Sequence, residues 1–244
     1  MRKNIIAVTA LLVSTSVFAA GDSHWTYSGS EGPEYWGELS PAFRACGDGR
    51  NQSPVNLTGF VEADLSPIVF NYEEGVSGIV NNGHTLKLDY KAGSSISVDG
   101  HRFELKQFHF HSPSENRING KTFPLEAHLV HADKDGNLAV VAVMFEEGKA
   151  NAALAKAWAH MPEKAGSPMN LPMHISAESL LPVSRDYYRF NGSLTTPPCS
   201  EGVLWLVMKD PVTASSEQIE KFRHAMHHDN NRPVQALNAR VVLQ

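Results

Sequence analysis

The 244-residue chain lacks a surplus of basic residues and, beyond its first 20 residues, a long apolar run. Its 21 Lys and Arg stand against 26 Asp and Glu, so a nucleic-acid partner is not expected. No later stretch approaches the roughly 20 apolar residues that a membrane-spanning helix needs. The sequence also has no internal repeat, low-complexity tract or linker that would divide it. We therefore expect one globular domain.

The first 20 residues have the pattern of a secretory signal peptide. Arg2 and Lys3 precede an apolar run that ends in the small residues of "VFAA". We predict a signal peptide over residues 1–20 and a mature domain over residues 21–244. Loss of the two basic residues changes the net charge from −5 to −7. The mature protein is expected to be exported, with the periplasm as the favoured compartment.

Cysteine is scarce, since Cys46 and Cys199 are the only two. In an oxidising compartment, two cysteines favour a disulfide, and two separate buried thiols are the alternative. A disulfide between them would close a long loop, and the chain-entropy model assigns such a bond about 5 kcal/mol of stabilisation.

Strand patterns dominate the rest of the chain. Segments such as "SSISVDGHRFELKQFHFH" and "NLAVVAVMFEEG" are rich in β-branched and aromatic residues and bounded by Gly, Asn or Asp. Two segments, "NAALAKAWAH" and "SSEQIEKFRHAM", instead space apolar residues at helical intervals. Ser215 and Gln218 predict a capping box for the second. The pattern predicts a mainly β protein with a few short helices.

Two histidine-containing segments predict a cluster of imidazoles. On a strand, His109 and His111 of "QFHFH" share one face with Gln107, while the phenylalanines occupy the other. The segment "LEAHLVH" places Glu126 and His128 together on one face in the same way. A third imidazole can thus meet the first pair across neighbouring strands.

Three neutral imidazoles with an open fourth position are typical of a catalytic zinc site, although copper, iron and nickel also accept imidazole. Gln107 and Glu126 each precede a histidine by two residues, where they can accept its second ring N–H. A single His-x-His pair more often consists of surface or structural histidines. The second segment favours a metal site, but the spacing identifies no reaction.

Several longer motifs occur in one order: "NQSPVN", "QFHFHSPSEN", "LEAHLVH", "GSLTTPPCSEGVLW" and "NNRPVQ". With them the chain resembles the α-class carbonic anhydrases, particularly the exported bacterial members, over essentially the whole predicted mature region. The resemblance implies a single, mainly β domain with minor α content. Its centre would be a twisted, mostly antiparallel sheet of about ten strands with short peripheral helices.

The activity that the resemblance implies is zinc-dependent, reversible hydration of CO₂ to bicarbonate and a proton by attack of zinc-bound hydroxide. It implies that His109, His111 and His128 bind Zn²⁺. The groups expected to support these rings are Gln107, Glu126 and the backbone carbonyl of Asn230.

The resemblance also assigns roles to residues outside the ligand set. Thr195 is expected to orient the nucleophile, with Glu115 accepting its hydroxyl proton, and Thr196 is expected to contact bicarbonate. His84 matches the proton-shuttle position, and histidine titrates nearest neutral pH. Read alone, His84 would be a solvated turn residue. The residues expected to order the intervening water are Tyr27 and Asn82.

An apolar pocket for CO₂ is implied as well, at positions that would otherwise be assigned to ordinary core. Its residues are Val130, Val140, Leu194, Val203 and Trp205. Lys87 departs from the pattern, because many relatives carry Asn or Gln there. We expect this cation to act on the water chain or to lower the pKa of His84.

Two further functions are consistent with parts of the sequence. A non-catalytic carbonic-anhydrase-like binding domain would be expected to have lost ligands, yet the three histidines, Glu115 and Thr195 are all present. A periplasmic zinc-holding protein would not need the Thr195 and Glu115 pair. The sequence leaves the oligomeric state, including a homodimer, open.

Overall fold

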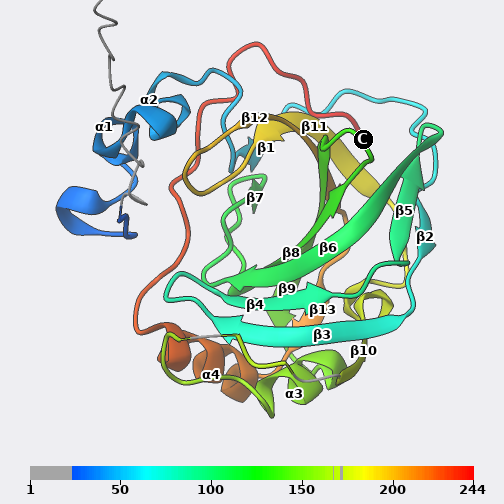
Figure 1. The fold of residues 1–244 in the computed structure, drawn as a ribbon. Coiled ribbons are helices and arrows are strands. Elements are labelled where there is room, and N and C mark those ends of the chain that lie inside the picture. Colours follow the sequence, from blue (N-terminus) through cyan, green and yellow to red (C-terminus); the bar gives the residue numbers. More distant parts are fainter. Residues whose placement is uncertain (1–23, 167, 171–172) are drawn as a thin grey trace, which may run out of the picture.

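The computed structural model describes residues 24–166, 168–170 and 173–244, and its main feature is a strongly curled sheet (Figure 1). The predicted signal peptide, residues 1–20, lies outside the described residues. The strands are β1 (Asn56–Leu57), β2 (Val69–Asn71), β3 (Glu74–Asn81), β4 (Leu86–Tyr90), β5 (Ser95–Val98), β6 (His101–His111), β7 (Arg117–Ile118), β8 (Leu125–Ala132), β9 (Leu138–Glu147), β10 (Met173–Ser176), β11 (Tyr187–Ser193), β12 (Glu201–Met208) and β13 (Val212–Ala214). The helices are α1 (Trp36–Leu39), α2 (Ala45–Asp48), α3 (Ala152–Trp158) and α4 (Ser216–Met226), with 3₁₀ turns at Gly29–Glu31, Pro41–Phe43 and Ala177–Leu180.

Eleven strands form the main sheet, and β1 and β7 form a separate parallel pair. The path of the main sheet runs β10-β3-β4-β6-β8-β9-β12-β11, while β5 joins β6 to β2 and β13 pairs with β9. Among the described strands of this sheet, only the pairings of β9 with β12 and β13 are parallel. The prediction of a mainly β domain around a mostly antiparallel sheet of about ten strands is confirmed.

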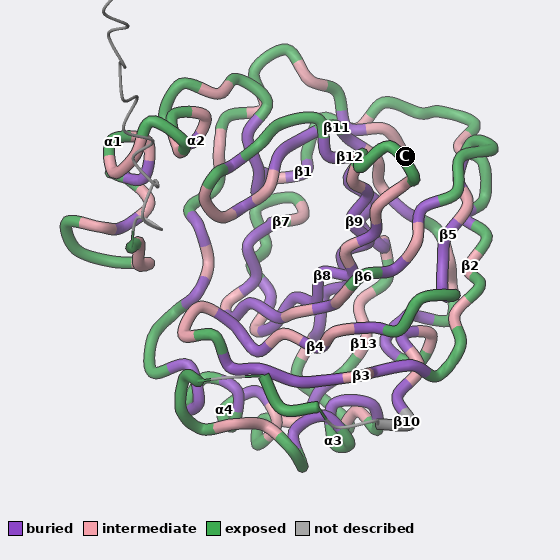
Figure 2. Tube along the Cα trace, in the orientation of Figure 1, coloured by how far each residue is buried: buried purple, intermediate pink, exposed green. Residues whose placement is uncertain are grey.

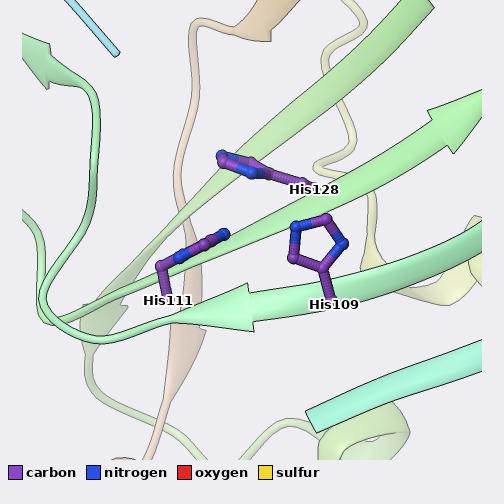
Figure 3. A group of neighbouring side chains, drawn as sticks. All are labelled: His109, His111 and His128. Atoms are coloured by element: carbon purple, nitrogen blue, oxygen red, sulfur yellow. The ribbon is translucent and has the colours of Figure 1, made fainter. Parts of the chain in front are cut away.

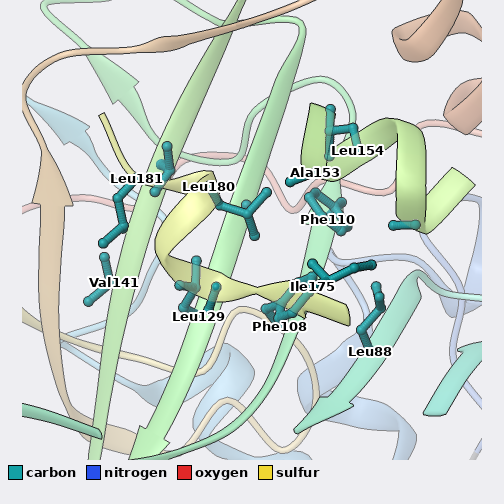
Figure 4. Packing of buried hydrophobic residues seen from close by; sticks show 14 of the residues in the cluster. Leu88, Phe108, Phe110, Leu129, Val141, Ala153, Leu154, Ile175, Leu180 and Leu181 are labelled. Atoms are coloured by element: carbon teal, nitrogen blue, oxygen red, sulfur yellow. The ribbon is translucent and has the colours of Figure 1, made fainter. Parts of the chain in front are cut away.

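Strand β8 lies between β6 and β9 in the middle of the sheet and is buried on both faces, because a hydrophobic cluster packs on each side. Its alternate residues therefore point into different clusters. Leu129 and its register partner Val141 pack with Phe108 and Phe110 in the larger cluster (Figure 4). The residues of β8 that alternate with Leu129, including His128, point to the opposite face of the sheet. In Figure 2, β3 is likewise buried along most of its length.

Helices α3 and α4 pack together against the larger cluster (Figure 1). The ring of Phe110 meets Trp158 of α3 at 4.9 Å and Phe222 of α4 at 6.2 Å between centroids. Ser215 and Gln218 form the predicted capping box, in which each side chain accepts a backbone N–H of the other. Both predicted helices are thus confirmed, and they cover the face of the sheet that carries the larger cluster.

A disulfide fixes the N-terminal segment to the body of the domain. Cys46 in α2 is bonded to Cys199, as predicted. Both lie in a small cluster with Trp36, against which Trp25 and Tyr27 pack. Among the described residues, no helix has the length and apolar character needed to cross a membrane.

Candidate metal centre

Three imidazoles converge on the face of the sheet opposite the larger cluster. His109 and His111 come from β6 and His128 from β8, and His109 is directly opposite His128 in the antiparallel register. One ring nitrogen of each lies within 4.8 Å of the others, and Figure 3 shows the rings turned toward a common point. The pairing of β6 with β8 therefore brings the predicted ligand set together.

Hydrogen bonds to the Nδ1 atoms of two rings, on the side away from the common point, fix the orientation of these rings. The Nδ1 atom of His109 lies 2.9 Å from Oε1 of Gln107, and Nδ1 of His111 lies 2.7 Å from the Asn230 carbonyl. Because these oxygens accept, each Nδ1 carries the proton and each Nε2 keeps its lone pair. Both lone pairs are thus available on the side where the rings meet.

The third ring is held by a buried carboxylate. Nε2 of His128 donates to Oε1 of Glu126 at 2.8 Å, which leaves Nδ1 with a lone pair. Glu126 in turn accepts from the backbone N–H groups of Glu115 and Asn116 and from the Asn116 side chain. The sequence reasoning did not single out Asn116, although it adjoins Glu115 in "PSEN".

The cluster has the properties of a metal site. Nε2 of His111 is buried and has no hydrogen-bond partner among the described residues. Burial lowers the pKa of His111 and, with a contribution from neighbouring rings, lowers the pKa values of His109 and His128 well below the ordinary value. The imidazoles are therefore neutral near pH 7, which is the form that ligates a metal. Three converging lone pairs fit one divalent ion.

Glu115 lies directly beside this cluster. Its Oε1 accepts the backbone N–H of Arg232 at 2.8 Å, and its Oε2 lies 3.4 Å from Nε2 of His111 and 3.8 Å from Nδ1 of His128. Burial raises the pKa of Glu115 well above its usual range, and hydrogen bonds from the Arg232 N–H and the Thr195 hydroxyl oppose that rise. Thr195 thus lies near Glu115, and the roles that the resemblance implies for the two residues stay a prediction.

Arg232 is a buried cation that the sequence reasoning missed, although it lies in the motif "NNRPVQ". Its guanidinium donates to Oε1 of Gln52 at 2.8 Å and to the carbonyls of Ser53 and Cys46 at 2.7 and 2.9 Å. Burial lowers its pKa to about 10, so it stays charged at neutral pH. Arg232 thus joins the backbone around Cys46 to the carboxylate of Glu115.

A cavity of about 160 Å³ opens beside the cluster, and its lining includes Tyr27, His84, His109 and Thr196. His84 is half-buried and lies flat against Trp25, with ring centroids 3.7 Å apart and planes inclined by 11°. The proximity of Trp25 was not predicted. Burial lowers the pKa of His84, and two nearby histidines, His24 and His228, lower it further.

Asn82 supports the turn that carries His84. Its Oδ1 accepts the backbone N–H groups of His84 and Thr85 at 2.9 and 2.8 Å, which is the usual behaviour of Asn in a turn. The role expected for Asn82, ordering water, stays a prediction alongside that of Tyr27, whose pKa burial raises well above the ordinary value.

The five residues predicted to form an apolar pocket lie together, because three are buried in one hydrophobic cluster and two, Val130 and Leu194, pack against it. They are Val130, Val140, Leu194, Val203 and Trp205. Trp205 contacts the histidine cluster, because its ring meets that of His128 edge-on with centroids 4.9 Å apart. An apolar wall thus adjoins the imidazoles on the face away from α3 and α4.

The disulfide tethers the segment that carries the predicted threonines. The Cys199 N–H donates to the Thr196 carbonyl at 2.8 Å, and the Gln52 amide donates to the Cys199 carbonyl at 3.0 Å. Thr195 and Thr196 therefore lie in a turn that is closed by hydrogen bonds and bonded covalently to α2.

Comparisons with known proteins identify the family of the chain. A family model described as eukaryotic-type carbonic anhydrase matches residues 31–244. A carbonic anhydrase of Pectobacterium atrosepticum is 48% identical over 99% of each chain, and one of Klebsiella pneumoniae is 49% identical over 96% of this chain and 94% of its own. The solved structure of the α-carbonic anhydrase from Thermovibrio ammonificans with the inhibitor sulfanilamide has a TM-score of 0.90 and 54% identity, covering 92% of this chain and all of that one. The chain therefore belongs to the α-class carbonic anhydrase family.

Proposed function

We propose that this protein is a zinc-dependent carbonic anhydrase that interconverts CO₂ with bicarbonate and a proton. The observation that carries the proposal is the convergence of three neutral imidazole lone pairs beside a cavity and an apolar wall. Its relatives of 48% and 49% identity that are named carbonic anhydrases support the same activity. Nitrogen donors with one open position suit Zn²⁺.

His109, His111 and His128 would hold the ion, and Gln107, Asn230 and Glu126 would keep each ring in the ligating tautomer. When bound, zinc supplies a nucleophile near neutral pH by lowering the pKa of a water molecule, an effect established for carbonic anhydrases.

Thr195 and Glu115 would select and orient that nucleophile. In its ionised form, Glu115 has only acceptor atoms and would accept a hydrogen bond from the Thr195 hydroxyl, so the threonine oxygen would be left to accept from the nucleophile. The charge of a dication near Oε2 favours this ionised form against the effect of burial. Only a group that carries a proton is then accepted, and its lone pair is aimed at the substrate carbon.

The substrate and product would meet different walls of the site. CO₂ has no net dipole and suits the apolar cluster, whereas bicarbonate can bond to the Thr196 hydroxyl. The residues that we assign to the CO₂ side are Val130, Val140, Leu194, Val203 and Trp205.

His84 would carry the proton to solvent. Its pKa is lowered from 6.5, so the ring is mostly neutral at pH 7 and can accept a proton from the cavity. Tyr27 and Asn82 border the same cavity, where they can order the water molecules between His84 and the cluster.

We place the protein in the periplasm, with residues 1–20 as a removed signal peptide and residues 21–244 as the mature domain. The disulfide between Cys46 and Cys199 supports an oxidising compartment.

Stopped-flow CO₂ hydration, measured with zinc content before and after chelation, tests the function. We expect one zinc per oxidised mature chain, loss of activity on chelation and recovery on adding zinc. Activity that survives removal of all metal would contradict the proposal. One bound zinc without activity would favour the zinc-holding alternative, and a non-catalytic binding domain would show neither zinc nor activity.

A further inference from the structure

Lys87 is a cationic residue in the wall of the cavity beside the three clustered histidines. It lies in β4 directly opposite His109 of β6 in the antiparallel register, so both side chains project from the same face. Among the ten described residues that line the cavity, Lys87 is the only lysine or arginine, and none is aspartate or glutamate. An anion entering this cavity therefore meets one permanent positive charge.

Asp89 partly balances this charge from outside the cavity. Nζ of Lys87 lies 2.9 Å from Oδ1 of Asp89, and the two side chains are 33% and 39% exposed. Lys87 lines the cavity and Asp89 does not, so the cationic residue of the pair is the one that borders the cavity.

We propose that Lys87 sets the affinity of the site for small monovalent anions, including the product bicarbonate, and that Asp89 limits this effect. The inference rests on the proposed function, because the anions bind where the metal and the product lie. CO₂ is uncharged and gains nothing from the lysine. For a side-chain charge that is 33% exposed and screened by water, we expect about a two- to fivefold contribution to anion affinity.

Thiocyanate binding to the cobalt-loaded protein tests this proposal without measuring turnover, because Co²⁺ in such a site reports its coordination through visible absorption. Lys87→Met is expected to raise the Kd for thiocyanate by about two- to fivefold. Asp89→Asn is expected to lower the Kd, because it removes the neutralising partner. Lys91→Met is the matched control, since Lys91 is exposed just beyond β4 and does not line the cavity.

An unchanged Kd in Lys87→Met would overturn the proposal. An equal shift in Lys91→Met would do the same, because the effect would then come from net charge rather than position. Lys87→Gln is titrated in parallel, and a Kd that differs from that of Lys87→Met would assign the effect to packing instead. If the wild-type protein proves inactive in CO₂ hydration but its cobalt form shows the Lys87 dependence, the proposed function fails, and the inference stands for anions at the metal site but not for bicarbonate as a product.

Discussion

His131 gives the most direct test of the described core, because its environment predicts a large effect of pH on stability. The ring is fully buried at the end of β8. Its Nδ1 faces the Ala139 carbonyl at 3.3 Å and its Nε2 lies 2.7 Å from the hydroxyl of Tyr72. The carbonyl only accepts, so Nδ1 carries the proton and Nε2 accepts from Tyr72. Burial disfavours the charged ring and lowers the pKa of His131 to about 3.

The size of the effect follows from linkage. Above the unfolded pKa of 6.5, the ring is neutral in both states and contributes no pH dependence. Between 6.5 and about 3, the unfolded chain binds a proton that the folded chain does not, so the free energy of unfolding falls as the pH falls. At about 1.4 kcal/mol per pH unit, the loss is about 2.7 kcal/mol at pH ~4.5 and approaches about 5 kcal/mol near pH ~3.

The perturbation is His131→Gln, which keeps one donor and one acceptor but does not titrate. Urea unfolding of the metal-free, disulfide-intact protein, followed by tryptophan fluorescence, gives the free energy of unfolding at about pH 7.5 and about pH 4.5. The drop between the two pH values should be smaller in the variant by about 2.7 kcal/mol, and other titrating groups cancel in this difference. Equal drops in the two proteins would refute the assignment of a buried neutral ring.

Three further predictions concern the proposed site. His84→Ala should slow turnover mainly in weak buffer, with recovery on adding imidazole; unchanged turnover in weak buffer would remove the shuttle role. Thr195→Val should lower kcat/KM by about a hundredfold with zinc content unchanged, because the nucleophile loses its orientation. Thr195→Ser should recover most of that loss, and a failure to recover would point to packing. Glu126→Gln should weaken zinc affinity about 10- to 100-fold in a competition titration with a chelator, and wild-type affinity would show that the carboxylate does not hold His128.

Local patterns predicted the parts of the fold that depend on neighbouring residues. The alternation in "QFHFH" correctly placed His109 and His111 on one face, because side chains alternate along any strand. Ser215 and Gln218 correctly marked the start of α4, because the capping box lies within one turn.

Local patterns could not predict contacts between segments that are far apart in the sequence. Arg232 meets Glu115 and Cys46 across separations of 117 and 186 residues, and no local spacing encodes such a contact. The stacking of Trp25 on His84 joins segments that are likewise far apart in the sequence. The parallel pairing of β9 with β12 also depends on the path of the whole sheet. For the same reason, the support of His111 by Asn230 was available only from the family resemblance.

The proposed proton shuttle and the three clustered histidines depend on different parts of the fold. Trp25, which stacks on His84, packs on the small cluster of Trp36, Cys46 and Cys199. The three clustered histidines instead lie on β6 and β8 in the middle of the sheet. Removal of the segment that carries Trp25 would therefore disturb His84, the proposed proton shuttle, while leaving the three imidazoles together, so loss of proton transfer need not accompany loss of the proposed metal site.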